Sequence, residues 1–257
     1  MFENFSLEII GPALTIGLML SLAFAPLGVE VLRRGIIFLD LAIAHIAGLG
    51  LILGAVFLPH APFWVPLLIT VFFVATFSVL FWYLERLQPQ IIEALIGATF
   101  VLAASITIFV IADHPHAGEL LTDLLSGQIL FVSWDDVVFH VPIFGTILLA
   151  LLLRRPNENP LLFYLLFGVT VTAAVQLVGV YIVFAGLILP ALTAQRLKRK
   201  LSTAWIAGLI SISGGMVLGV VTDKPIGPCI VISYGLFYLL VVTFQRVRKG
   251  DIQTPLN

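Results

Sequence analysis

Long apolar stretches dominate this sequence and constrain its fold more than any other feature. A helix needs about 20 apolar residues to cross the hydrocarbon core of a bilayer. The stretches that are free or nearly free of charge are Ile9–Val29, Gly35–Leu58, Ala61–Leu84, Ala94–Ala112, Val137–Leu153, Leu161–Gln195, Leu201–Val221 and Pro225–Gln245. They fill the chain, so we expect a single transmembrane domain over residues 1–257.

The charge content leads to the same fold class. Hydrophobic residues make up 60% of the chain and charged residues only 11%, against about 25% charged in an average soluble domain. So few charges exclude both a soluble globule and a disordered chain, and there is no basic stripe for nucleic acid. The single cysteine, Cys229, excludes a disulfide framework and a thiolate metal cluster. The sequence therefore predicts an all-α, polytopic helical bundle surrounded by membrane lipid.

One stretch, Leu161–Gln195, is too long for a single upright crossing. As a straight helix it would measure about 50 Å, whereas the bilayer core is about 30 Å thick. If it crosses once, most of the basic residues that follow fall on the outer side. If it folds back and crosses twice, every basic residue except Lys224 is cytoplasmic, as the positive-inside rule favours. Of the eight to nine segments that the sequence allows, we therefore predict nine, with a turn near Gly179–Gly186.

This topology sorts the remaining charges across the membrane. The outer side receives most acids and four histidines: Glu3, Glu8, Asp113, Glu119, Asp123, Asp135, Asp136, Asp223, His60, His114, His116 and His140. Two interpretations remain open. The acids can simply fill loops after insertion has sorted the basic residues, or they can form an outer funnel that concentrates cations by electrostatic focusing.

Asp40 and His45 are the candidate ligands within a membrane segment. A carboxylate and an imidazole form a plausible partial shell for zinc, manganese or iron. Their spacing places them about 140° apart on a regular helix, so both face one site only if the helix is bulged or broken; otherwise they serve different neighbours. In the alternative interpretation, Asp40 pairs with Arg33 or Arg34, and His45 bonds to a neighbouring backbone group. The residues alone leave both open.

Other polar or small positions have structural explanations. Glu93 opens its segment, where the helix dipole favours an acid. Gln176 and Tyr181 are explained by hydrogen bonds between helices, and the glycines near Gly215 by close helix packing. The outer segment Gly118–Val137 has apolar residues at helical spacing, interrupted at Ser126-Gly127, and is expected to lie at the interface or over the bundle's outer mouth.

Three strings, taken in order, resemble one known family. They are APLGVEVLRRGIIFLDLAIAH, then DLLSGQILFVSWDDV, and finally VQLVGVYIVFAGLILPALTAQR followed by DKPIGPCIVISYGLFYLL. Together they resemble the metal-ion permease family of ABC transporters, the membrane subunits that import zinc, manganese or iron. The resemblance extends over nearly the whole chain.

The resemblance implies a multi-pass subunit of the plasma (inner) membrane that forms a homodimeric channel. It also implies a cytoplasmic ABC ATPase, which hydrolyses ATP on a separate chain, and an extracytoplasmic metal-binding protein; no cofactor is implied. Asp40 and His45 match the Asp and His of the family's second helix, which are usually four apart and here are five apart. The family's cytoplasmic segment before the sixth span is reduced here to Arg154–Pro160.

Two other functions remain as alternatives. The short Arg154–Pro160 loop is compatible with a stand-alone membrane carrier that does not couple to an ATPase. An intramembrane enzyme could use Asp40 and His45 as acid and base. The sequence contains no phosphate loop, nucleophile elbow or zinc-protease helix. Which metal is carried does not follow from these ligand types.

Overall fold

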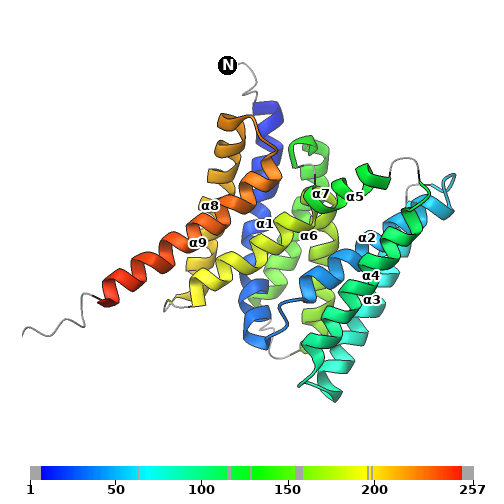
Figure 1. Ribbon diagram of the computed structural model, residues 1–257, viewed down its shortest axis with the longest axis horizontal. Helices are drawn as coiled ribbons and strands as arrows, with labels where there is room; N and C mark the ends of the chain where they lie inside the picture. Colours follow the sequence, from blue (N-terminus) through cyan, green and yellow to red (C-terminus); the bar gives the residue numbers. More distant parts are fainter. Residues whose placement is uncertain are drawn as a thin grey trace, which may run out of the picture.

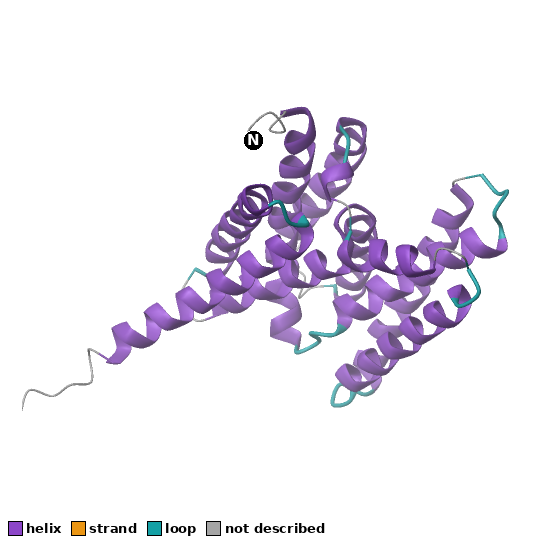
Figure 2. Cartoon of the chain, turned by 45° about the horizontal axis from the view of Figure 1, so that its top comes forward, coloured by secondary structure: helices purple, strands orange, loops and turns teal. Residues whose placement is uncertain are grey.

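The computed structural model describes residues 7–62, 64–114, 117–127, 129–153, 159–195, 197 and 199–250. Within these ranges the chain forms helices and no strand, so the all-α prediction is confirmed (Figure 2). The helices are α1 (Leu7–Arg34), α2 (Leu39–Phe57), α3 (Trp64–Leu87), α4 (Ile92–Ile111), α5 (Ala117–Ser126), the short 3-10 helix η1 (Ile129–Phe131), α6 (Trp134–Leu153), α7 (Pro160–Gln195), α8 (Lys200–Thr222) and α9 (Ile226–Gly250).

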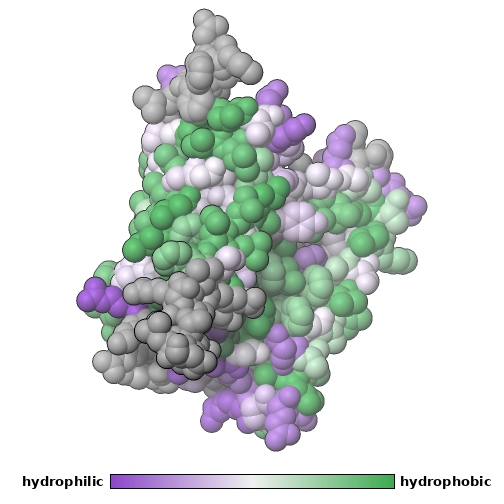
Figure 3. Space-filling model, turned by 60° about the vertical axis from the view of Figure 1, so that its left-hand side comes forward, coloured by the Kyte–Doolittle hydropathy of each residue, from purple (hydrophilic) through white to green (hydrophobic). Residues whose placement is uncertain are grey.

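Eight of these helices are long and apolar enough to cross a membrane, and α5 is not among them. Each coincides with one predicted stretch, and α5 ends at Ser126, where the sequence predicts an interruption. The surface agrees with this assignment. In Figure 3, hydrophobic residues cover the middle of the visible face, and hydrophilic ones gather toward its ends. The molecule is a polytopic helical membrane bundle.

Helix α7 contains a break at Gly179, at the start of the range in which the turn is predicted. Gly179 has φ 76° and ψ 166°, a combination that is essentially restricted to glycine. Figure 1 shows the yellow second half of α7 turning back from the first half at this level. The chain therefore reverses where the two-crossing topology requires it, and Pro190 lies inside the second half.

The start of α7 is also explained by its sequence. Asn159 Oδ1 accepts a hydrogen bond of 3.2 Å from the backbone N–H of Leu162, which is the usual role of an N-cap residue. Pro160 follows as the first helical residue, where its fixed φ and missing N–H are tolerated best. These two residues therefore set the point at which α7 begins.

Helices α2 and α7 form the interior of the bundle. Their most apolar windows are 72% and 78% buried, whereas those of α3, α4 and α6 are only 22% buried. Helix α2 packs against α3, α4 and α7, while α7 also contacts α1, α3, α5, α8 and α9. Helices α2 and α7 therefore contribute most of the buried interior of the bundle.

Small residues let the C-terminal helices approach closely, as the sequence predicts. A methyl group added to Gly215 of α8 would lie 2.3 Å from the Cα of Ile230 in α9. On its other side, α8 is held to α1, because the Trp205 indole N–H donates a 3.0 Å hydrogen bond to the carbonyl of Leu22. Interhelical contacts of both kinds stabilise bundles in lipid.

The two-crossing topology predicts that residue 198 faces the cytoplasm. In a Cys229→Ser background, a cysteine placed at Lys198 should react with a membrane-impermeant maleimide only in inverted vesicles. A cysteine placed at His60 is the matched control and should react only from the opposite, outer side. Labelling of the Lys198 position from outside intact cells would contradict the nine-segment topology. Lys198 itself lies outside the described residues.

Candidate functional site

Asp40 and His45 both lie on α2, which is α-helical from Leu39 to Phe57. The bulge or break that would bring the two side chains to one face is absent from this helix. They therefore leave the axis about 140° apart, and they occupy different surroundings. This arrangement agrees with the second possibility from the sequence, in which the two side chains serve different neighbours.

His45 faces a cavity of about 510 Å³. Its Nδ1 lies 2.9 Å from the carbonyl oxygen of Leu41. Because a carbonyl can only accept, Nδ1 carries the proton and Nε2 is left with a free lone pair. The edge of the imidazole meets the ring of Phe100 from α4, with centroids 4.8 Å apart. This is the orientation that metal-binding histidines usually have, with the second ring nitrogen tied to a backbone acceptor.

The cavity is lined mainly by apolar side chains from α2, α4, α5, α9 and the second half of α7. They are Leu41, Phe100, Leu125, Val180, Phe184, Ala185, Ile188, Leu189 and Val231, with His45 and Tyr181 as the two lining residues that carry polar side-chain atoms. An imidazole and a phenol in such apolar surroundings can bind an ion weakly and release it, because few ligands replace its water.

Asp40 does not line this cavity. It lies in the first turn of α2 and is only 1% exposed. Neither of its carboxylate oxygens has a hydrogen-bond partner in the described part of the chain. Buried polar groups are normally paired, so an unpaired buried carboxylate is the most unusual polar group on α2. In membrane segments such residues commonly mark ion pathways.

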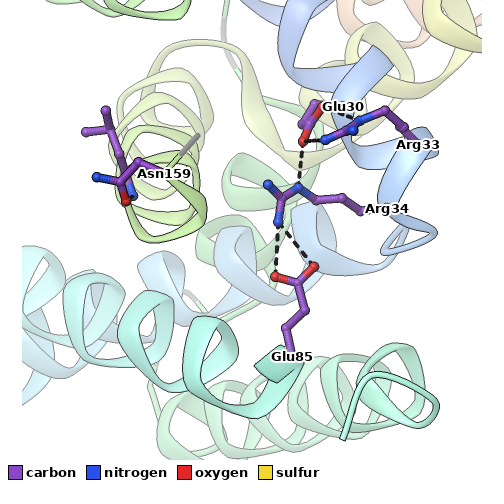
Figure 4. Close-up of polar contacts among 6 residues, drawn as sticks. Glu30, Arg33, Arg34, Glu85 and Asn159 are labelled. Atoms are coloured by element: carbon purple, nitrogen blue, oxygen red, sulfur yellow. Dashed lines mark hydrogen bonds and ion pairs between the residues drawn. The ribbon is translucent and has the colours of Figure 1, made fainter. Parts of the chain in front are cut away.

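The pairing of Asp40 with Arg33 or Arg34 is not seen, because other acids bind both guanidinium groups (Figure 4). Arg33 Nε donates to Glu30 Oε2 at 2.7 Å. Arg34 Nε donates to Glu30 Oε1 at 2.7 Å, and its Nη1 lies 3.0 Å from Glu85 Oε2. Arg34 also lies over the ring of Phe163, 4.6 Å from its centroid. Arg34 therefore links α1, α3 and α7 at the end predicted to be cytoplasmic.

Glu93 has a structural role, but on a different helix from the one the sequence suggests. Its Oε1 accepts a 3.1 Å hydrogen bond from the backbone N–H of Phe38, at the start of α2. Glu93 itself lies in the first turn of α4. A single carboxylate is thus placed at the N-terminal ends of two helices, where both helix dipoles favour it.

Among the side chains that the structure describes, the predicted outer acids and histidines do not converge on a common site. Asp136 Oδ2 accepts from the hydroxyl and the backbone N–H of Ser133 at 2.7 Å and 2.9 Å, which caps α6. His140 Nδ1 bonds to the carbonyl of Asp136 at 2.9 Å. Across the described ranges, no three His, Cys, Asp or Glu side chains are grouped to hold a metal ion. Glu3 and His116, like residues 154–158 of the short loop, lie outside the described residues, and so does the side chain of Asp123.

Sequence reasoning missed Phe100 and Tyr181 as cavity residues. Phe100 carries no polar signal in an apolar stretch. Tyr181 is 49% exposed and lies two residues beyond the break at Gly179. The glycine predicted to form a turn is the one signal that could have found it, since the first residues after a broken membrane helix often face a cavity.

Comparison with known proteins places these features in a family. The model of the ABC 3 transport family matches residues 6–158 and 155–245. The solved structure of PsaBC from Streptococcus pneumoniae in complex with Fab has the same fold. Its TM-score is 0.73 at 20% identity, and the match covers 93% of this chain and 92% of that one.

Relatives of similar length are membrane proteins of metal transport systems. The high-affinity zinc uptake system membrane protein ZnuB of Haemophilus influenzae is 27% identical, over 94% of this chain and 99% of that protein. A probable iron transport system membrane protein of the same organism is 24% identical, over 96% and 98% of the two chains. With the eight apolar helices, these similarities identify a multi-pass protein of the plasma membrane. The family match extends over most of the sequence, and the chain is therefore a member of the ABC 3 transport family.

Proposed function

We propose that this chain is a single-domain permease of an ABC importer for divalent transition metal ions, namely zinc, manganese or iron. Family membership sets the class of protein. The observation that carries the substrate class is His45, whose Nε2 has a free lone pair and which faces a cavity between α2 and the second half of α7. Imidazole nitrogen suits zinc and iron better than it suits calcium or magnesium, and the carboxylate of Asp40 is a ligand type that suits manganese.

In this proposal, His45 and Asp40 act at successive positions and not as one chelate. The ion is released from water at the outer mouth and binds His45 in the cavity. It then moves about one and a half helical turns along α2 toward the unpaired carboxylate of Asp40, nearer the cytoplasmic end. Two weak, separate sites favour passage, because a complete ligand shell would hold the ion too tightly to release it.

The proposal includes three partners that the family implies. A second copy of the chain completes the channel, a cytoplasmic ABC ATPase supplies the energy, and an extracytoplasmic metal-binding protein delivers the ion. Purification in mild detergent tests the ATPase directly. A stoichiometric ATPase should accompany the chain, whereas its absence under conditions that preserve transport would favour the stand-alone carrier.

The ligand assignment predicts that His45→Ala and Asp40→Ala each reduce metal uptake by at least about tenfold, since even loss of a ligand's hydrogen-bond partner costs about 10–100-fold in metal affinity. Uptake of radioactive zinc or manganese by cells that depend on this protein measures the effect. Thr76→Ala is the matched control, because its exposed hydroxyl bonds only to the Phe72 carbonyl of its own helix. Normal uptake by either variant, at equal abundance in the membrane, would contradict the role of that residue.

A further inference from the structure

The start of α2 lacks a capping side chain of its own. The first N–H groups of a helix have no acceptor within the helix, and a Ser, Thr, Asp or Asn just before the helix usually accepts one of them. Here the residue in that position is Phe38, which makes no side-chain cap. Phe38 itself is 44% exposed, whereas Leu39 and Asp40, which follow it, are buried.

The missing acceptor comes from another helix. Glu93 Oε1, in the first turn of α4, accepts the backbone N–H of Phe38 at 3.1 Å. Farther along the same helix, Phe100 contacts the imidazole of His45. Glu93 and Phe100 are separated by about two helical turns, so they lie on the same face of α4. That face therefore contacts α2 both at its start and at His45.

Asp40 is the residue of α2 best placed to cap the helix, yet it does not do so. A carboxylate in the first turn can turn back onto the free N–H groups of that turn. Both oxygens of Asp40 are instead buried without a hydrogen bond from any described residue. Glu93 already accepts the N–H of Phe38 at the start of α2. The carboxylate of Asp40 is therefore not used for this hydrogen bond.

From this arrangement we infer that Glu93 is a positioning residue for transport. By accepting the N–H at the start of α2, it keeps the carboxylate of Asp40 free for the passing ion. When Glu93 is removed, Asp40 turns back to cap its own helix and is withdrawn from the ion path. This inference rests on the proposed function, because it requires Asp40 to act on the transported ion.

Hydrogen exchange tests the capping step without any transport measurement. In nanodiscs, Asp40→Ala alone should leave exchange at the Phe38 amide unchanged, because Asp40 does not cap α2. Glu93→Ala should change it little, because Asp40 takes over. The double variant has no acceptor left, and exchange there should rise at least about fivefold, as expected for loss of an N-cap. Equal exchange in Glu93→Ala and the double variant would overturn the inference, as would acceleration by Asp40→Ala alone.

Uptake tests the consequence for the ion. Glu93→Ala should raise the apparent KM for zinc or manganese about fivefold. This is the factor by which loss of a typical N-cap hydrogen bond shifts an equilibrium, here the one between the free and the capping conformation of Asp40. Glu93→Gln keeps the accepting oxygen and should restore the KM to within about twofold of the wild type. Thr99→Ala, which removes a hydroxyl bonded within α4, is the matched control and should transport normally.

The two failures can be distinguished. If Asp40→Ala transports normally, the role of Asp40 in the proposed function is wrong, and the positioning role of Glu93 is then wrong too. If Asp40→Ala is inactive but Glu93→Ala retains the wild-type KM, the proposed function stands and only the role of Glu93 is wrong. A defect in Glu93→Gln as large as that in Glu93→Ala would also overturn it, because the charge and not the cap would then be responsible.

Discussion

Replacement of Gly179 by alanine is expected to destabilise the folded protein by about 3 kcal/mol, because it combines backbone strain with a steric clash. Its φ of 76° and ψ of 166° strain any residue with a Cβ atom. A Cβ at this position would also lie 2.3 Å from the backbone nitrogen of Gly127 and 2.7 Å from its Cα. Neither atom can move aside as a flexible side chain would. The thermal midpoint in detergent and the abundance in the membrane should both fall.

Gly127→Ala should have an effect of similar size, since its Cβ would lie 2.1 Å from the carbonyl carbon of Val178, and Gly127 has φ 63°. Gly145→Ala is the matched control. Gly145 lies within α6, and a Cβ there meets nothing within 4 Å. Alanine is favoured over glycine in a helix by about 0.5–1 kcal/mol, so this variant should be as stable as the wild type or more so. If Gly179→Ala behaves like Gly145→Ala, the contact between the α5–η1 corner and the α7 break is not as close as described.

Arg34→Ala should destabilise the protein by about 3–5 kcal/mol, the usual effect of removing one member of a buried ion pair. The side chain of Arg34 is 9% exposed, and those of Glu30 and Glu85 are 8% and 21% exposed. Without the guanidinium, Glu85 has lost the cation beside it, and Glu30 retains only the half-exposed Arg33. The free energy of unfolding in mixed micelles measures the effect.

Two further variants separate the ion pairs from the loss of a long side chain. Arg86→Ala removes an exposed arginine that lies over the Trp82 ring at 5.3 Å, and it should cost about 0.5–1 kcal/mol. Adding Glu85→Gln to Arg34→Ala should recover part of the stability, because one uncompensated charge is removed. Equal effects of Arg34→Ala and Arg86→Ala would show that the buried network contributes little.

The helical bundle and its spans could be predicted because hydrophobicity and length alone decide which segments cross a bilayer. The reversal within Leu161–Gln195 followed from the basic residues on either side, and glycine limited it to Gly179–Gly186, at the start of which the break lies. The contact between Gly127 and Gly179 could not be predicted. It depends on how the outer segment packs against α7, and no local pattern encodes that packing.

The candidate site could be predicted only in part. Asp40 and His45 stood out because polar groups are costly in a membrane segment, and their spacing already indicated that they face different directions. The partners of Arg34 could not be found in this way. Glu30 is a near neighbour in sequence, but Glu85 reaches Arg34 only through the packing of α3 against the bundle. The same holds for Glu93, whose hydrogen bond to Phe38 joins two helices far apart in the chain.

The break in α7 has a mechanical consequence. A continuous helix is stiff, because bending it strains the hydrogen bonds along its length. The first half of α7 is anchored through Phe163 to Arg34, while the second half forms a wall of the cavity beside His45. At Gly179 the stiffness is interrupted at a single residue. Under the proposed function, the cavity wall can therefore tilt while the anchored half keeps its place, and the buried ion pairs at the predicted cytoplasmic end need not break.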